Sequence, residues 1–313
     1  MNGKRLLYDR NDTSQRHGRD GSKGVQRRSF LQKMGVAAAA FTTATNAVSA
    51  TPSTRPVDSL ESDSEAITID YDQYTQPSEI YDVWTGDETT ASFIDTPTTA
   101  SSQALEMAVK EGDSWGTNAM YSLPENGYGQ PTQAYQRIMV RLSDDWTMQP
   151  NDVCRIMAMG FNTEAGTAGS GVRGPPAGDN GWSSVICVTN REDPPAGTYR
   201  LATYTYHMDY DSGAGEFEVT NAAIPVGEWV SLESYVRMNT HEGGTANHDG
   251  VVRYWLDGEL AFERENYRWT TTDGQAIEYV GPIVRYGGGE VAPQDQSFRY
   301  DEHEISVSTN AAR

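Results

Sequence analysis

The chain has 313 residues, 37% of them hydrophobic, and carries 24 lysines and arginines against 44 aspartates and glutamates, a formal net charge of −20. This acidic balance argues against nucleic-acid binding, because phosphates require a basic stripe on the protein. Neither of the two cysteines belongs to a Cys/His cluster with metal-ligand spacing, so no zinc site is predicted.

Residues 1–50 have the pattern of an export signal. A twin-arginine motif at residues 26–31 precedes an apolar stretch at residues 34–41 that is too short to span a bilayer, and residues 48–50 are small enough for cleavage. The alternative is a basic disordered tail. We therefore expect a protein that is secreted or held at the cell surface through the twin-arginine pathway, with no membrane span in the mature chain.

The charge of the remaining chain is more extreme than that of the whole. Residues 51–313 hold 15 basic and 41 acidic side chains, a net charge of −26, and Lys110 is the only lysine among them. Molar salt shortens the screening length to about 3 Å and removes most of the self-repulsion of such a surface. This composition favours a protein of a halophile, although an acidic surface that only improves solubility is the simpler alternative.

The predicted domain organisation is a disordered linker at residues 51–65 followed by one β domain at residues 66–313. Helix signals are nearly absent, and the longest candidate, residues 101–110, also fits a strand. Period-2 or β-rich runs separated by Gly, Pro and Asp clusters predict strands at 91–95, 104–110, 119–123, 134–142, 152–161, 183–189, 198–210, 216–220, 229–238, 251–256, 260–267, 276–286 and 297–308. So many strands without intervening helices predict an all-β sandwich or jelly roll of two antiparallel sheets.

Two long loops interrupt this pattern. Residues 162–180 are glycine-rich, which is typical of a functional lid or of a disordered segment. Residues 239–249 form a polar loop between a strongly alternating strand and a strand that ends at the hairpin signal Asp257-Gly258. Cys154 and Cys187 lie in two strand-like runs, so a disulfide would require these strands to be neighbours, and two buried free thiols fit the sequence equally well.

The run 198–210 contains the first candidates for chemistry. Alternation places Tyr204 and Tyr206 on one face of the strand and His207 on the other. Tyrosine also favours strands for ordinary packing reasons, so the pair alone does not establish a site.

Basic residues are concentrated in the middle of the chain. The window 137–200 has six arginines and seven acids, and is nearly neutral within a strongly acidic chain; the arginines are Arg137, Arg141, Arg155, Arg173, Arg191 and Arg200. If these strands share one face, that face attracts an anion, and arginine binds carboxylates through two parallel hydrogen bonds. The alternative is that these arginines form surface ion pairs with neighbouring acids.

The order of several short motifs resembles that of the jelly-roll polysaccharide lyases, the alginate and glucuronan lyase-like families of the concanavalin A-like superfamily. The resemblance covers roughly residues 90–308. Its landmarks are residues 105–114, 118–121, Gly181-Trp182-Ser183-Ser184, Tyr204-Thr205-Tyr206, Gly227-Glu228-Trp229, Met238-Asn239-Thr240 and residues 252–258.

The resemblance implies a concanavalin A-like β-sandwich whose concave sheet binds an acidic polysaccharide and cleaves it by β-elimination. Tyr204 and Tyr206 match the catalytic Tyr-x-Tyr pair, Ser183 matches the family's serine, and Arg155 falls near the family's lysine. A further set of residues is then expected to bind substrate: Arg137, Arg141, Arg200 and His207. No cofactor is required, and we expect a monomer.

Two observations keep other functions open. Val185 occupies the position of the family's arginine and cannot neutralise a carboxylate, so a non-catalytic carbohydrate-binding or cell-surface domain is the main alternative. A glycoside hydrolase would need two carboxylates across the scissile bond, and the Glu-x-Asp-x-x-Glu strand of sandwich glucanases is missing. We expect the acids at residues 301–304 to face solvent or to hold calcium.

Overall fold

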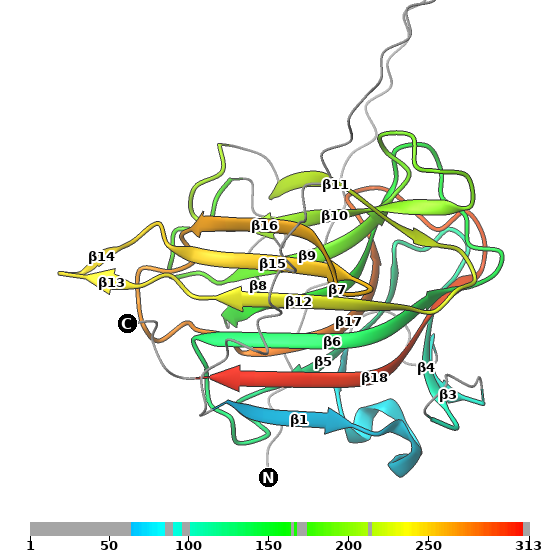
Figure 1. Ribbon diagram of the computed structural model, residues 1–313, viewed down its shortest axis with the longest axis horizontal. Helices are drawn as coiled ribbons and strands as arrows, with labels where there is room; N and C mark the ends of the chain where they lie inside the picture. The colour runs from blue at the N-terminus through cyan, green and yellow to red at the C-terminus, as the bar shows by residue number, and fades with distance from the viewer. Residues whose placement is uncertain are drawn as a thin grey trace, which may run out of the picture. The chain divides into compact units, whose positions relative to one another are not determined.

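The computed structural model describes residues 64–84, 90–95, 101–163, 166–167, 174–211 and 215–308 (Figure 1). These residues all belong to the compact unit Ser53–Arg313. The expected export signal, Arg173 and almost all of the expected linker lie outside the described residues. None of the helices described is long and apolar enough to cross a membrane.

Two antiparallel sheets form the described part of the chain, and Figure 1 shows them as two layers. The first sheet has the order β16 (Glu259–Tyr267), β15 (Gly250–Leu256), β12 (Val230–Arg237), β6 (Gln133–Leu142), β18 (Gln296–Ser308), β4 (Ala104–Val109) and β3 (Ala91–Ile94), with β1 (Glu65–Ile69) also paired to β18. The second has the order β11 (Glu216–Pro225), β10 (Thr198–Tyr206), β9 (Trp182–Thr189), β7 (Val153–Thr163), β17 (Tyr279–Tyr286), β5 (Trp115–Ser122) and β2 (Asp82–Trp84), with β8 (Gly166–Thr167) paired to β7. The prediction of a jelly-roll β-sandwich is confirmed.

Alternation explains how the sheets pack. In β6, every second side chain from Ala134 to Leu142 is fully buried, whereas Arg137 and Arg141 point to the other face. Residues such as Trp182, Leu201 and Ile138 form the core between the two sheets. Each sheet therefore has one face in the core and one face turned away from it, which we call its outer face.

Several boundaries differ from those predicted. β4 (Ala104–Val109) is the strand predicted at residues 104–110, so the helix alternative for residues 101–110 is wrong. β1 begins inside the expected linker, and the predicted strand 198–210 ends at Tyr206. The sequence did not indicate the short strands β2 and β8, the hairpin of β13 (His241–Glu242) and β14 (Thr245–Ala246), or the 3-10 helices η2 (Tyr71–Gln73) and η3 (Pro77–Glu79). These elements are too short to show a periodic pattern.

The acids at residues 301–304 lie inside the last strand. They occupy the middle of β18, where the register shifts between Asp301 and Glu304. Asp301 and His303 are buried, and Asp301 accepts a hydrogen bond from Ser101 Oγ. Among the residues that the structure describes, no three His, Cys, Asp or Glu side chains are placed to hold a metal ion. The expectation that these acids face solvent is wrong for Asp301, which is buried and bonded to Ser101.

The burial of His303 makes the stability of the fold depend on pH. Its Nδ1 lies 2.9 Å from the Tyr81 hydroxyl, and burial lowers the pKa of His303 from 6.5 to about 3. The unfolded chain therefore binds this proton more readily, so the contribution of neutral His303 is complete above pH 6.5 and is lost as the pH falls towards 3. At pH 4.5, two units below the unfolded pKa, protonation of this side chain is expected to lower the free energy of unfolding by roughly 3 kcal/mol.

The measurement is urea unfolding at constant salt, at pH 7 and pH 4.5, of the wild type and of His303→Gln. The acid loss should be smaller in the variant, because glutamine does not titrate, while the carboxyl groups common to both proteins cancel in the comparison. Equal acid losses in the two proteins would contradict the role of His303.

Candidate functional site

The four residues predicted to be catalytic share the outer face of the second sheet. In the antiparallel register, Tyr206 pairs with Ser183 and Tyr204 pairs with Val185, so β10 and β9 place these side chains side by side. Arg155 of β7 pairs with Cys187 of β9, one alternate position further along. Three neighbouring strands thus bring Tyr204, Tyr206, Ser183 and Arg155 together.

The two phenols are in direct contact. Tyr206 donates a hydrogen bond of 2.8 Å to the Tyr204 hydroxyl, and their rings meet edge to face with centroids 5.1 Å apart. Only 6% of Tyr206 is exposed, and burial, with Tyr204 as a second cause, raises the pKa of Tyr206 well above its ordinary value of 10. Tyr206 therefore keeps its proton at neutral pH and can act as a proton donor.

Arg155 supplies a positive charge beside the two phenols. A bulge in β7 between Arg155 and Met157 turns two successive residues to the core and leaves Arg155 on the outer face. Its guanidinium lies 4.9 Å above the centroid of the Tyr204 ring, and Nη1 donates to the carbonyl of Tyr286 at 3.2 Å. Arg155 is 8% exposed, so its charge acts in a medium that screens it less than water does.

Backbone segments from two loops hold the phenols in place. Gly215 has a φ of 96°, and a Cβ atom there would lie 3.1 Å from atoms of both the Tyr204 and Tyr206 rings. Only glycine fits this position without strain. On the other side, Tyr210 packs edge to face on Tyr206 and donates a 2.5 Å hydrogen bond to the carbonyl of Gly174.

Val185, which stands at the position of the family's arginine, has apolar neighbours in the structure. Val185 lies between Tyr204 of β10 and Ala158 of β7, in a small cluster that also contains Cys187 and Ala202. This part of the face has no cation of its own. Arg155 is therefore the side chain that can neutralise a carboxylate near Tyr204.

Arg200 lies on the same face of β10 but at its far end. It is four residues from Tyr204, or about 13 Å along the strand. Its Nη1 donates to the carbonyl of Asn221 at 2.6 Å. Arg200 is thus outside the group formed by Tyr204, Tyr206 and Arg155.

Arg137 and Arg141 lie in the other sheet, and the expectation that the central arginines share one face is wrong for them. Both belong to β6, because the chain passes to the opposite sheet between β5 and β6. Arg137 lies 3.6 Å from a carboxylate oxygen of Glu304, and Arg141 pairs with Asp144. The alternative of surface ion pairs describes these two arginines.

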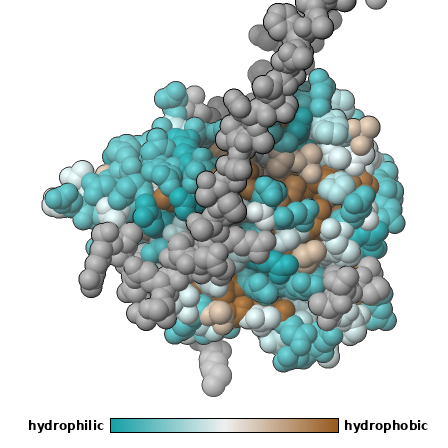
Figure 2. All heavy atoms as spheres, in the orientation of Figure 1, coloured by the Kyte–Doolittle hydropathy of each residue, from teal (hydrophilic) through white to brown (hydrophobic). Residues whose placement is uncertain are grey.

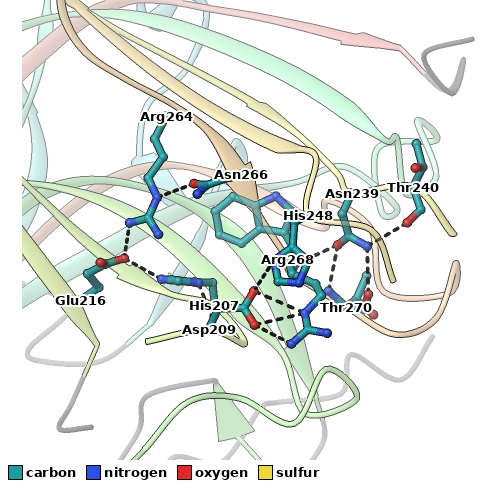
Figure 3. A network of polar contacts seen from close by, with 11 residues as sticks. His207, Asp209, Glu216, Asn239, Thr240, His248, Arg264, Asn266, Arg268 and Thr270 are labelled. Atoms are coloured by element: carbon teal, nitrogen blue, oxygen red, sulfur yellow. Dashed lines mark hydrogen bonds and ion pairs between the residues drawn. The ribbon is translucent and has the colours of Figure 1, made fainter. Parts of the chain in front are cut away.

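His207 does not line the outer face with the phenols. It is buried against Tyr267, and its Nδ1 accepts a hydrogen bond from the Asp209 N–H, so Nε2 carries the proton and lies 2.6 Å from the Glu216 carboxylate (Figure 3). Burial lowers the pKa of His207, while Glu216 opposes this change. Its role in the structure is to tie the end of β10 to β11.

Glu216 continues this polar network across the edge of the sandwich. It also pairs with Arg264 of β16 in the first sheet, and Asp209 binds Arg268 through a carboxylate–guanidinium pair (Figure 3). These contacts join the strand that carries the phenols to the opposite sheet.

Two residues of β17 on this face were not predicted from the sequence. Arg285 pairs in register with Arg155, and its guanidinium lies 3.3 Å from the centroid of the Trp115 ring. Tyr279 pairs with Gly160 of β7. No motif marked either residue, and only the pairing of β17 with β7, which are far apart in the sequence, places them here.

The fold is similar to that of solved alginate lyases. A mutant of alginate lyase Aly36B, in complex with an alginate trisaccharide, matches with a TM-score of 0.58 and 17% identity over 79% of this chain and 98% of that chain. Alginate lyase vAL-1 from Chlorella virus matches with a TM-score of 0.59 and 15% identity, covering 77% and 98%. A marine PL-14 alginate lyase from Aplysia kurodai gives 0.55 and 14%, covering 73% and 90%.

No model of a protein family and no curated protein sequence matches the chain. The structural matches therefore establish the class through the fold alone: a jelly-roll β-sandwich of the kind found in polysaccharide lyases. More particularly, the fold is alginate lyase-like, which confirms the resemblance inferred from the sequence motifs.

The cysteines do not form the disulfide that the sequence left open. Cys154 and Cys187 lie on neighbouring strands, but Cys154 points into the core and Cys187 to the outer face. Burial raises the pKa of the Cys187 thiol to about 12 and that of Cys154 well above its ordinary value. Both thiols are thus inert in the native state.

We expect neither thiol to react with iodoacetamide in the folded protein, and both to react after unfolding in guanidinium chloride. Intact-mass measurement without reductant reports the number of added groups. Labelling of native protein at Cys187, or a mass lower than that of the dithiol by two hydrogen atoms, would contradict this arrangement.

Proposed function

We propose that the protein is an exported polysaccharide lyase that cleaves a uronic-acid-containing polysaccharide by β-elimination. The observation that carries the proposal is the contact chain from the Tyr206 hydroxyl to Tyr204 and on to the guanidinium of Arg155. A proton donor, a second phenol and a cation are the groups that this reaction needs. The solved structures with this fold include enzymes named as alginate lyases, one of them bound to an alginate trisaccharide.

Arg155 begins the proposed reaction by binding the carboxylate of the sugar. Neutralising this charge lowers the cost of removing the neighbouring C5 proton, because the electrons left at C5 spread into the carboxylate. In this scheme Tyr204, reacting as the phenolate, removes the proton, and the guanidinium of Arg155 lies over its ring.

Elimination then breaks the C4–O bond as the C4=C5 double bond forms. Tyr206 donates its proton to the leaving oxygen. The raised pKa of Tyr206 keeps this proton on its hydroxyl until that step. Tyr204 is now protonated and Tyr206 is not, so transfer along their 2.8 Å hydrogen bond restores the starting state. Ser183, beside Tyr206 in the register, is placed to bind a sugar hydroxyl.

A non-catalytic carbohydrate-binding domain is the second candidate. It is favoured by the apolar centre of the face, where Val185, Ala158 and Ala202 offer no charge. The same aromatic and cationic side chains could bind an acidic glycan without cleaving it. The two candidates differ in whether a new double bond is formed.

Export and a saline setting complete the proposal. The twin-arginine pattern of residues 26–31 and the net charge of −26 on residues 51–313 support a protein that is secreted or held at the cell surface of a halophile. Extracellular polysaccharide would be its substrate.

The first test measures ultraviolet absorbance of the unsaturated uronate released from alginate, polyglucuronate and other acidic glycans in molar salt. We expect an increase with the wild type and a rate about 10²- to 10⁴-fold lower with Tyr206→Phe, which removes the proton donor and keeps the ring. Tyr199→Phe is the matched control, because Tyr199 lies on the same strand and its hydroxyl donates to Trp146 instead. Binding of a glycan without any increase in absorbance would favour the second candidate.

Salt provides an independent prediction. A protein with a net charge of −26 repels a polyanion at low ionic strength, and salt screens this repulsion. The affinity for an acidic glycan, measured by calorimetry, should therefore rise or stay constant between low and molar salt. A steady loss of affinity over this range would contradict the proposed screening.

A further inference from the structure

A row of hydroxyl groups crosses the outer face of the second sheet. Tyr206 of β10 pairs with Ser183 of β9, Ser183 pairs with Gly160 of β7, and Gly160 pairs with Tyr279 of β17. Residues paired in this way project from the same face of a sheet. The register therefore places a third phenol, Tyr279, in line with the hydroxyls of Tyr206 and Ser183.

Gly160 brings this third phenol closer to the other two. A Cβ atom at residue 160 would lie 2.7 Å from the Tyr279 hydroxyl oxygen and 2.5 Å from the carbonyl oxygen of Trp182. The ring of Tyr279 thus extends from β17 across β7, and its hydroxyl occupies the space that any other residue at position 160 would fill. It is half-buried and packs on the same apolar cluster as Tyr204.

The distance between these groups indicates which part of a substrate each would meet. The Tyr279 hydroxyl lies above β7, two strand spacings or about 10 Å from β10. One pyranose ring does not bridge that gap. A sugar that reacts at Tyr204 and Tyr206 would therefore leave Tyr279 to the next sugar of the polymer.

The strip beside this row has short side chains. One alternate position along the strands, the next row of paired residues on this face consists of Tyr204, Val185, Ala158 and Gly281. Arg155 belongs to the row after that, two alternate positions from the row of hydroxyl groups. A polysaccharide chain lying on this strip would have hydroxyl groups along one side and the cation of Arg155 on the other.

We propose that Tyr279 is a substrate-binding residue that recognises the sugar adjacent to the one undergoing elimination. Its hydroxyl forms a hydrogen bond with a hydroxyl or ring-substituent oxygen of that neighbouring sugar. This inference rests on the proposed function and extends it by one binding position. In this proposal Tyr279 contributes to substrate affinity and to the preferred substrate length, and Tyr204 and Tyr206 carry out proton transfer.

The test compares wild type, Tyr279→Phe and Tyr199→Phe in molar salt, using alginate, polyglucuronate and oligosaccharides of increasing length. Phenylalanine keeps the ring over Gly160 and removes only the hydroxyl. Loss of one hydrogen bond of ordinary strength should raise KM and the calorimetric Kd of Tyr279→Phe by about 3- to 10-fold. The kcat should stay within about 2-fold of wild type. The effect should be absent with the shortest oligosaccharide that is bound and appear when the next sugar is added.

Thermal unfolding of each variant establishes that the fold is retained. Unchanged KM and Kd in Tyr279→Phe, or a lower kcat at unchanged KM, would overturn the assignment of Tyr279. If the wild type binds a glycan but forms no double bond, the lyase proposal fails, and weaker binding by Tyr279→Phe then supports Tyr279 only as a glycan-binding residue. If the wild type eliminates and Tyr279→Phe binds as well as wild type, only the inference fails. Absence of both binding and elimination on every glycan would overturn both.

Discussion

The antiparallel register of β10, β9 and β7 is the constraint on which the site depends. It is fixed from the inside, because Leu201, Ile186 and Met159 are almost fully buried between the sheets and a slip by one residue would turn them outward. The outer face follows from that inner packing. Tyr204 and Tyr206 are side by side with Val185 and Ser183 because the core permits only this pairing.

The electrostatics of the molecule contrast with those of the site. Most described arginines are neutralised by acids, as Arg137 is by Glu304 and Arg253 by Glu263, whereas the contacts of Arg155 are an aromatic ring and a backbone carbonyl. A cation kept in this way costs free energy unless an anion binds nearby. An acidic protein thus keeps a cation beside the two phenols that could attract an anion, and salt reduces the opposition from the rest of its surface.

Alternation along single strands made part of this site predictable. It places Tyr204 with Tyr206 and His207 opposite them, as the structure shows. It could not assign Arg137 to a sheet, because consecutive strands cross between the sheets, nor place Tyr279 beside Gly160, because β17 and β7 pair across more than a hundred residues. The bulge next to Arg155 and the register shift between Asp301 and Glu304 also break the period on which such predictions rely.

The opposite orientations of Cys154 and Cys187 bear on how the protein matures. Its only two thiols are separated by the plane of one sheet, so no oxidation step can add a covalent link to the fold. Every interaction that holds the sandwich together is available in a reducing compartment. The fold can therefore be completed under reducing conditions, and a reductant would find no disulfide to break.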